Sequence, residues 1–454
     1  MEDTVLQEKQ VFYQKLGEIT GAENVLTGEK ATAPYTVDGI SPQAVVYPAS
    51  TGQVADIIKA ANESRTILVP WGGGSKQYIG PCLEAADTVL CLKNMKRVVE
   101  LEASNFTTQV QAGMVNDELQ KQLAEKNLFF PLDPFYIESS TIGGEIATNA
   151  NGPRRILYGA VRDLVLGVTV VTPTGDIIHT GGKTMKNVAG MDLCRMYIGS
   201  WGTLGIITEA VLRLFPLPEV STGIYITFPG PEDAFRVVGQ LLNSPLTPSA
   251  IELVDSVAGR NVAETAGSSL SDDEVFLIVN AEGTKGDVER HRKDITSLAK
   301  ANKAKSIMTL EEEKASGAWK AYRGIHRAML GASSSALQGK ASVPISKLGD
   351  MVQRVKKVST SQGVEIGVTA HCGNGILYTY LADEHEKLVR ITGELKQAAA
   401  SLGGFFLIEV APLSVRKEVA ILPPRDDYQI MRHLKTGFDP NNILNPGRLA
   451  GGLH

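Results

Sequence analysis

The sequence contains few cysteines, and none of them forms a closely spaced pair. Its 454 residues include four cysteines, Cys82, Cys91, Cys194 and Cys372, and no Cys-x-x-Cys spacing. An iron–sulfur or zinc site made by one chain normally uses such neighbouring thiolates, so we expect neither site here. Scattered thiols are typical of a protein from a reducing compartment.

The sequence also lacks a long apolar run and an excess of basic residues. No stretch of about 18 uncharged apolar residues occurs, so we expect no membrane-spanning helix. The start, Met1 to Thr4, is acidic, and we expect no secretory signal. The expected location is cytoplasmic, with peripheral attachment to the inner membrane through partners left open. The formal net charge of −5 argues against nucleic acid as a partner.

The length and composition predict a folded protein of two or three domains. Apolar residues make up 43% and charged residues 21% of the chain, which is typical of globular proteins. Prolines at 216, 218, 229 and 231 follow Phe215 and place a domain boundary near 217. We expect an N-terminal helix and connector over 1–40, one domain over 41–217, another over 218–430, and a tail over 431–454.

Periodicity predicts mixed helices and strands in both domains. Expected helices are one ending near Gly21, one capped by Thr51, and those at 116–126, 233–243, 287–302 and 386–402. Expected strands are 44–47, 66–69 ending at Pro70, 168–171, 275–280, 366–369 and 377–381. The alternation after residue 217 indicates an α+β domain. The segment 438–449 is rich in Asn, Pro and Gly and cannot form a long regular element.

A glycine-rich loop follows the strand expected at 66–69. It reads Pro70-Trp71-Gly72-Gly73-Gly74-Ser75-Lys76. Three glycines allow backbone N–H groups to converge on an anion such as a pyrophosphate without steric clash. The loop matches neither a Walker motif nor the G-x-G-x-x-G turn, and taken alone it is as consistent with a flexible turn.

Two further segments rich in small residues strengthen the case for a cofactor slot. One comprises Pro131-Leu132-Asp133-Pro134 and the stretch 139–152, which begins Ser139-Ser140 and contains Gly143-Gly144. The other comprises Gly181-Gly182, the stretch 186–190, and Gly199 to Glu209. Together with the glycine loop they span about 140 residues, and turn chemistry alone is a poor explanation for all three.

The order of these motifs resembles the FAD-linked oxidases of the p-cresol methylhydroxylase and vanillyl-alcohol oxidase type. The shared patterns are G-G-G-S, P-L-D-P, I-G-G-x-x-A-T-N-A, G-S-x-G-T-L-G-I-I-T-E and F-D-P-N-N-I-L-N-P-G-R. Within that group the chain is similar to the subunits of bacterial glycolate oxidase and D-lactate dehydrogenase. The resemblance implies a two-subdomain FAD-binding domain of the p-cresol methylhydroxylase type over 41–217. An α+β cap domain with an antiparallel sheet would follow, and the tail would return to the FAD domain.

The resemblance also implies which residues hold FAD. The expected cofactor-binding residues are Trp71, Gly72, Gly73, Gly74, Ser75, Lys76, Pro131, Leu132, Ser139, Ser140, Gly143, Gly144, Asn149, Gly152, Gly205, Ile206 and Asn445. Some relatives attach the flavin covalently through a His in the glycine loop. Here the loop carries Ser75 and Lys76 instead, so we expect FAD to be bound non-covalently.

The catalytic motifs of the group are incomplete in this chain. Catalytic members carry H-A-G-D-G-N-L-H and G-E-H-G, whose two His and Glu bind a divalent metal. This chain keeps His371 and Glu409, but it has Tyr378 and Val410 where the motifs have His. One imidazole and one carboxylate hold a metal poorly, so we expect none.

Four residues are the remaining candidates for catalysis: Arg323, His371, Tyr378 and Glu409. Arg323 matches the W-x-x-x-R that grips a substrate carboxylate, although a surface Arg on a helix is an equally good interpretation. His371 taken alone is more often structural than a ligand.

One subfamily accounts for the incomplete motifs. The E subunit of glycolate oxidase reads G-P-R-R-x-x-x-G-x-V-R-D-x-V-L-G and K-N-V-A-G-x-D, and this chain matches both at 152–167 and 186–192. Such subunits work beside a second FAD subunit and an iron–sulfur subunit, whereas the cap domain here is longer than theirs. We therefore expect an FAD-binding oxidoreductase subunit of a glycolate- or D-lactate-type complex, acting as an electron relay or non-catalytic flavin subunit. The alternatives are a self-sufficient FAD-dependent dehydrogenase using Tyr378 or His371 as acid/base, and an interaction subunit that has lost its flavin.

Overall fold

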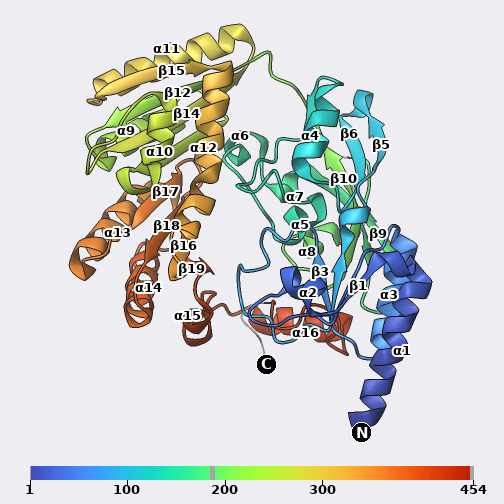
Figure 1. Ribbon diagram of the computed structural model, residues 1–454. Helices are drawn as coiled ribbons and strands as arrows, with labels where there is room; N and C mark the ends of the chain where they lie inside the picture. Colours follow the sequence, from blue (N-terminus) through green and yellow to red (C-terminus); the bar gives the residue numbers. More distant parts are fainter. Residues whose placement is uncertain (1, 185–189, 450–454) are drawn as a thin grey trace. The chain divides into compact units, whose positions relative to one another are not determined.

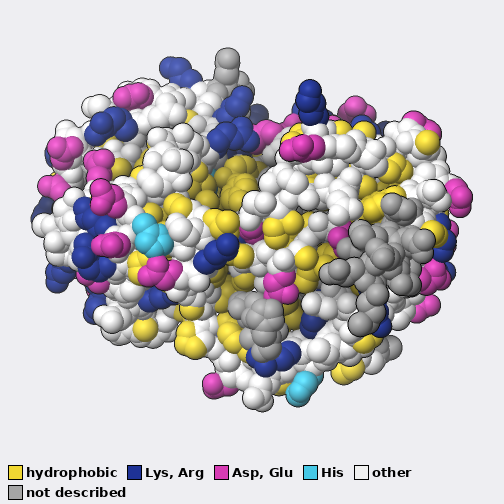
Figure 2. All heavy atoms as spheres, turned by 60° about the horizontal axis from the view of Figure 1, so that its bottom comes forward, with side chains coloured by type: hydrophobic (Ala, Val, Ile, Leu, Met, Phe, Trp, Pro, Cys, Tyr) yellow, Lys and Arg dark blue, Asp and Glu magenta, His cyan; other side chains and the backbone are white. Residues whose placement is uncertain are grey.

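The computed structural model describes residues 2–184 and 190–449, and its contacts divide the chain into two compact units. The first unit comprises Met1–Asn151, Ala160–Leu217 and Pro424–His454, and the second comprises Gly152–Gly159 and Pro218–Pro423. Both units mix helices and strands (Figure 1), which confirms the α+β class. Figure 2 shows acidic and basic side chains interspersed over the visible surface.

The first unit contains the cavity described below. Its helices are α1 (Glu2–Thr20), α2 (Glu29–Thr32), α3 (Thr51–Glu63), α4 (Asn116–Ala124), α5 (Ile142–Ala147), α7 (Val161–Leu164), α8 (Cys194–Tyr197) and α16 (Tyr428–Phe438). Its strands are β1 (Val25–Thr27), β2 (Ala44–Val46), β3 (Leu68–Trp71), β4 (Thr88–Cys91), β5 (Val98–Glu102), β6 (Thr107–Gln111), β7 (Leu128–Phe129), β8 (Val165–Val171), β9 (Ile177–Gly181), β10 (Ile206–Arg213) and β11 (Phe215–Pro216). They form a four-stranded sheet in the order β1-β2-β4-β3, a five-stranded antiparallel sheet in the order β5-β6-β10-β8-β9, and a small β11-β7 pair.

Two local predictions in this unit were wrong in detail. Thr51 is the first helical residue of α3, and the cap is Ser50, whose Oγ accepts a hydrogen bond from the Gln53 N–H at 3.2 Å. Strand β3 also continues through Pro70 to Trp71. A proline is tolerated there because β3 is the last strand of its sheet, where no neighbouring strand needs the missing N–H.

The tail covers this outer strand. The Leu68 N–H donates to the carbonyl of Ile443 at 2.8 Å, and the Asn445 N–H donates to the carbonyl of Leu68 at 3.0 Å. Ile443 and Leu444 are fully buried in the core of the first unit. The irregular tail therefore satisfies the polar groups of an edge strand that would otherwise be left open.

The second unit is built on one large sheet. Its strands are β12 (Val220–Phe228), β13 (Ala250–Asp255), β14 (Val275–Gly283), β15 (Ser306–Glu311), β16 (Ala336–Ser342), β17 (Gly367–His371), β18 (Ile376–Ala382) and β19 (Phe405–Val410). Its helices are α6 (Arg155–Tyr158), α9 (Pro231–Leu242), α10 (Ser256–Ala266), α11 (Lys285–Ala301), α12 (Glu312–Gly331), α13 (Leu348–Gln362), α14 (His385–Ala400) and α15 (Leu413–Glu418). All pairings in the order β15-β12-β14-β13-β17-β18-β16-β19 are antiparallel, which confirms the expected sheet.

The two faces of this sheet differ in character. Val368 and Ala370 of β17 belong to the apolar core that the sheet shares with helices α9, α11, α13 and α14. Because side chains alternate along a strand, Thr369 and His371 lie on the opposite face. Tyr322 and His326 of α12 are buried with them. A polar cluster therefore occupies a sheltered position between sheet and helix.

Within the described residues, we find no helix that combines the length and the apolar character needed to cross a membrane.

Candidate functional site

A cavity that is partly open to solvent lies in the first unit. Its walls come from three segments that are distant in sequence: the glycine loop after β3, the region around α5, and the turn leading into β10. Leu92, Ala112 and Asn445 complete the lining. The three motif segments singled out in the sequence therefore meet around one space.

Most residues expected to bind the cofactor line this cavity. They are Trp71, Gly72, Gly73, Gly74, Ser75, Lys76, Ser140, Gly143, Gly144, Gly205, Ile206 and Asn445. Five others do not line it: Pro131, Leu132, Ser139, Asn149 and Gly152. Gly152 belongs with the second unit, although its sequence position is within 41–217. The cofactor roles of all these residues stay predictions.

Several lining residues were missed by sequence reasoning. They are Pro70, Gln77, Leu92, Ala112, Thr141, Glu145, Ala147, Thr148, Trp201, Gly202 and Ile207. Most are neighbours of motif residues, and the motifs themselves could have indicated them. Leu92 and Ala112 carry no such signal, because they directly follow β4 and β6 and only the folding of these strands brings them to the cavity.

The glycines of the loop permit close packing between two walls. A Cβ on Gly73 would lie 1.7 Å from the Ser139 carbonyl oxygen, and one on Gly72 would lie 2.0 Å from Thr141 Oγ1. Gly74 has φ +76°, a conformation that favours glycine. The glycine loop is therefore pressed against the 139–141 segment, which explains how Ser139 shapes the cavity without lining it.

A buried carboxyl group lies in the α5 wall. Glu145 Oε1 accepts a hydrogen bond from Ser140 Oγ at 2.5 Å, and Asn116 Nδ2 donates to Oε2 at 2.9 Å. Burial raises the pKa of Glu145 to about 7, and nearby Asp133 acts in the same direction. These hydrogen bonds, together with the charge of Lys76, oppose the rise. Glu145 is thus easily neutralised in a cavity expected to receive an anion.

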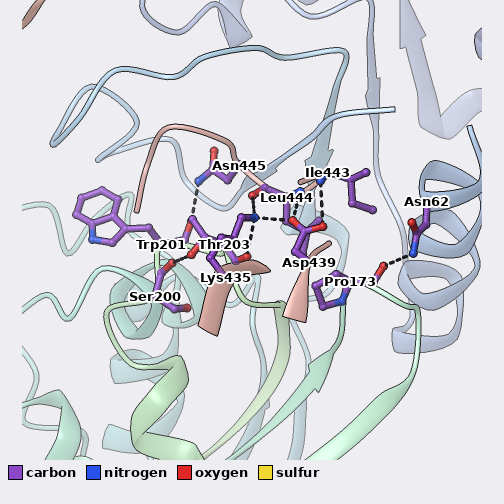
Figure 3. A network of polar contacts seen from close by, with 10 residues as sticks. All are labelled: Asn62, Pro173, Ser200, Trp201, Thr203, Lys435, Asp439, Ile443, Leu444 and Asn445. Atoms are coloured by element: carbon purple, nitrogen blue, oxygen red, sulfur yellow. Dashed lines mark hydrogen bonds and ion pairs between the residues drawn. The ribbon is translucent and has the colours of Figure 1, made fainter. Parts of the chain in front are cut away.

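The tail wall is held by a buried lysine (Figure 3). Lys435 Nζ donates to the Thr203 carbonyl at 3.0 Å, to the Leu444 carbonyl at 2.8 Å and to Asp439 Oδ2 at 2.5 Å. The carboxylate of Asp439 accepts from the N–H groups of Ile443 and Leu444. Asn445 then follows, and its Nδ2 donates to the Trp201 carbonyl at 2.6 Å. The network connects α16 to both the tail and the turn that lines the cavity.

A second buried cation fixes the loop that follows the glycines. The Arg448 guanidinium donates to the carbonyls of Gln77, Ile79 and Pro81, and it lies 3.4 Å from Asp38 Oδ2. Gln77 is itself a lining residue. The tail is therefore tied to two walls of the cavity at once.

The cavity fits FAD in its chemistry. It combines a glycine loop without Cβ atoms, the cation Lys76, and apolar walls from Trp71, Leu92 and Ile206. Such a site suits a ligand with a pyrophosphate and flat aromatic rings. Among the described residues that line it there is no His or Cys, so the lining offers neither of these side chains for a covalent flavin bond.

A second group of polar residues lies on the sheet of the second unit. Antiparallel register makes Glu252 of β13 the Cα partner of His371 of β17, and Lys340 of β16 the partner of Tyr378 of β18. His371 Nδ1 and Glu252 Oε2 share a hydrogen bond of 2.6 Å, and the Tyr322 hydroxyl donates to the same oxygen. The rings of His371 and Tyr378 meet edge to face with centroids 5.5 Å apart.

Glu409 joins this group from the neighbouring strand. A register shift between Gln338 and Gly339 lets one carboxylate meet two side chains of β16. Gln338 Nε2 donates to Glu409 Oε2 at 2.9 Å, and Lys340 Nζ lies 3.5 Å from Oε1. The structure thus brings His371, Tyr378 and Glu409 onto one face of the sheet. Arg323 is half-buried on α12, one residue after Tyr322.

Burial dominates the electrostatics of this group. It raises the pKa of Glu252, although the contact with His371 opposes the rise. It also raises the pKa values of the Tyr322 and Tyr378 phenols well above their ordinary value, and the charge of Glu252 or Glu409 adds to the effect. Both tyrosines are therefore neutral hydrogen-bonding groups, and a Tyr378 phenolate is disfavoured as a base.

Among the described residues, no three His, Cys, Asp or Glu side chains are arranged to hold a metal ion. The metal implied by the motifs of the group does not fit this chain, because Tyr378 and Lys340 take up the space beside His371 and Glu409.

The segment matching the E-subunit pattern divides between the two units. Its first part, Gly152–Gly159, packs with the second unit, where Arg154 lies 3.2 Å from the buried Glu282. Of the other motif, Lys186 to Ala189 lie outside the described residues.

Comparisons with known proteins match both halves of the chain. Residues 42–181 match the family described as "FAD binding domain", and residues 217–449 match "FAD linked oxidases, C-terminal domain". The glycolate oxidase subunit GlcD of Bacillus subtilis is 30% identical over 450 residues, covering 96% of each chain. A D-lactate dehydrogenase of Archaeoglobus fulgidus is 30% identical over 415 residues, covering 89% of this chain and 91% of its own.

Solved structures show the same fold at lower identity. p-Cresol methylhydroxylase with substrate bound aligns with a TM-score of 0.77 at 17% identity, over 97% of this chain and 96% of its own. Alkyldihydroxyacetonephosphate synthase aligns with a TM-score of 0.75 at 21% identity over 96% of this chain and 84% of its own. Together with the two family matches, these similarities establish that the chain belongs to the FAD-linked oxidases and is an FAD-dependent oxidoreductase.

Proposed function

We propose that this chain is an FAD-binding subunit of a 2-hydroxy-acid dehydrogenase of the glycolate or D-lactate type. The names of its relatives support the substrate class, and the word "subunit" in one of them supports a complex. The observation that carries the proposal is the buried pair of His371 and Glu252. A histidine whose ring is bonded to a buried carboxylate can serve as the base when an alcohol is oxidised.

Oxidation of a 2-hydroxy acid to a 2-oxo acid removes a proton from the hydroxyl group. It also removes a hydride, which is a hydrogen with two electrons, from the carbon that carries this hydroxyl. Bound FAD supplies the two-electron acceptor. In our assignment His371 donates through Nδ1–H to Glu252, so its Nε2 is the proton acceptor of the neutral ring. The carboxylate of Glu252 then stabilises the imidazolium that forms. Tyr322, bonded to the same carboxylate, fixes its orientation.

A second candidate is an electron relay that does not react with the hydroxy acid itself. It is favoured by Tyr378 and Val410, which stand where catalytic relatives have His. In that case a partner flavin subunit would oxidise the substrate, and an iron–sulfur subunit would complete the chain of carriers. FAD would be held non-covalently in either case.

Anaerobic flavin reduction separates the two candidates. The purified chain, loaded with FAD, is mixed with D-lactate or with glycolate, and the flavin absorbance is followed. We expect bleaching by at least one of them, and its loss in His371→Gln with FAD still bound. If hydroxy acids leave the absorbance unchanged while dithionite bleaches it, the dehydrogenase proposal is wrong and the relay is favoured. Co-purification of the native protein then identifies its partners.

A further inference from the structure

Lys340 belongs to the polar group in the second unit and contacts two of its members, Glu409 and Tyr378. It comes from β16, and its neighbours come from β18 and β19 on either side. Its Nζ lies 3.5 Å from Glu409 Oε1 and 5.6 Å from the centroid of the Tyr378 ring. A carboxylate and an aromatic face are two environments that attract a cation. The ammonium is therefore held by geometry on two sides.

These neighbours occupy the positions at which metal-binding relatives have ligands. Tyr378 and Glu409 match a His and the Glu of the two motifs. A divalent ion approaching Glu409 would meet an ammonium at Oε1 and an amide N–H at Oε2. The positive charge at this place is thus already supplied by the chain itself.

The ammonium is also accessible. The Lys340 side chain is 28% exposed and that of Glu409 is 16% exposed, whereas Glu252 and His371 are almost fully buried. Lysine is a compact point charge with three donors on a flexible stem, so one ammonium can meet Glu409 and still bind another anion.

We propose that Lys340 takes the place of the divalent metal, so that the second unit binds the carboxylate of its ligand through a built-in ammonium and needs no metal ion. The identity of the ligand as a 2-hydroxy acid rests on the proposed function. The exclusion of the metal does not, because it follows from the contacts of Lys340 and from Tyr378, which stands at a ligand position.

Metal binding is tested without measuring enzymatic turnover. After dialysis against EDTA, the FAD-loaded chain is titrated calorimetrically with zinc chloride, and metal in the protein as purified is measured by mass spectrometry. We expect less than stoichiometric metal and no saturable zinc binding. Bound metal at one equivalent, or flavin reduction that EDTA abolishes and zinc restores, would overturn the proposal.

A pair of variants isolates the role of Lys340 in excluding the metal. Tyr378→His supplies an imidazole beside His371, and Tyr378→His with Lys340→Ser also removes the ammonium. We expect the double variant to bind zinc at least ~10-fold more tightly than the single variant, because only there has Glu409 Oε1 lost the competing ammonium. If the two variants bind zinc alike, Lys340 is not what occupies the cation position. Circular dichroism checks that both variants fold.

The ligand is tested with oxamate, a carboxylate that has no hydroxyl carbon to oxidise. Its binding is followed by the change in flavin absorbance and by calorimetry. Loss of one charge-assisted hydrogen bond should weaken binding by about 10- to 100-fold in Lys340→Met, with partial recovery in Lys340→Arg. The control Lys347→Met removes another paired lysine of the same unit, whose partner is Asp350, and should leave affinity unchanged. Equal oxamate affinity in wild type and Lys340→Met would refute the anion role.

The experiments distinguish a failure of the proposed function from a failure of the ammonium site. If hydroxy acids do not reduce the flavin but oxamate binding still depends on Lys340, the proposed function is wrong and the ammonium site stands. If hydroxy acids reduce the flavin and Lys340→Met reacts with unchanged apparent affinity, the proposed function stands and the ammonium site is wrong.

Discussion

Replacement of Lys435 by methionine should loosen the cofactor cavity without touching any residue that lines it. Methionine keeps the length of the side chain but removes the charge that joins Asp439 to the carbonyls of Thr203 and Leu444. The Lys435 side chain is 13% exposed and that of Asp439 is 1% exposed, so the variant leaves a buried carboxylate without its cation. Breaking a buried ion pair in this way costs about 3–5 kcal/mol.

This loss of free energy should mainly weaken the docking of the tail onto the rest of the first unit. We expect FAD to bind the conformation in which Asn445 completes the cavity, so its apparent dissociation constant should rise as the fraction of docked molecules falls. A loss of about 3 kcal/mol in docking corresponds to roughly 150-fold in the docking equilibrium. The apparent affinity for FAD falls by that factor at most. The fall is smaller where docking in the wild type is so favourable that most molecules of the variant still have the tail docked.

Two measurements check this expectation. Urea unfolding of the apoprotein gives the stability, and titration of the apoprotein with FAD, followed by quenching of flavin fluorescence, gives the affinity. Lys15→Met is the matched control, because Lys15 pairs with Glu63 in the same unit while both side chains are well exposed. Such a surface pair contributes less than about 1 kcal/mol. If Lys435→Met behaves like Lys15→Met in both measurements, the buried network does not hold the tail.

Three further predictions concern single residues. Gly73→Ala should weaken FAD binding at least ~10-fold, because the new Cβ would overlap the Ser139 carbonyl; Gly182→Ala, which meets no atom within 4 Å, should bind normally in the same fluorescence titration. Burial raises the Glu145 pKa to about 7, so the folded chain holds this proton longer than the unfolded chain, and the free energy of unfolding decreases as pH rises from about 4.5 to 7, by at most about 3 kcal/mol. Urea unfolding at pH 5 and pH 8 should show a smaller difference in Glu145→Gln, and an unchanged difference would contradict the assignment. His371→Gln should retain FAD yet lose bleaching by hydroxy acids in stopped-flow absorbance, and reduction at the wild-type rate would remove His371 from the mechanism.

Local patterns predicted the elements well, because the physics that forms them is local. In α3 the residues Val54, Ile57, Ile58 and Ala61 recur at helical spacing, and all four are buried, so the pattern alone predicts this helix. The cap of the same helix was misplaced by one residue, because Ser50 and Thr51 are equally suitable by type and only backbone geometry selects Ser50.

The cavity could be predicted only where its walls are continuous in sequence. The composition of the glycine loop and of the Gly143-Gly144 pair indicates that they line a cavity. Leu92 and Ala112 reach the cavity only because the strands before them pair in sheets. The packing of Gly73 against Ser139 likewise depends on two loops meeting. No residue pattern in either loop encodes that meeting.

The polar group of the second unit shows the same limit more strongly. Motif comparison identified His371, Tyr378 and Glu409, but it gave no role to Glu252 or Lys340. These two become neighbours of the others through strand register, Glu252 opposite His371 and Lys340 opposite Tyr378. A carboxylate more than a hundred residues from its histidine partner cannot be paired with it by spacing alone.

The discontinuous make-up of the first unit imposes an order on biosynthesis. The ribosome makes the glycine loop early, then the whole segment Pro218–Pro423, and only afterwards the tail that carries Asn445. A nascent chain therefore has most of a flavin cavity for a long time without the means to close it. We therefore expect the cofactor to be captured only after translation has passed Asn445. A messenger truncated anywhere before the codon for Asn445 would yield a protein with an incomplete cavity, however well the remainder of the chain folds.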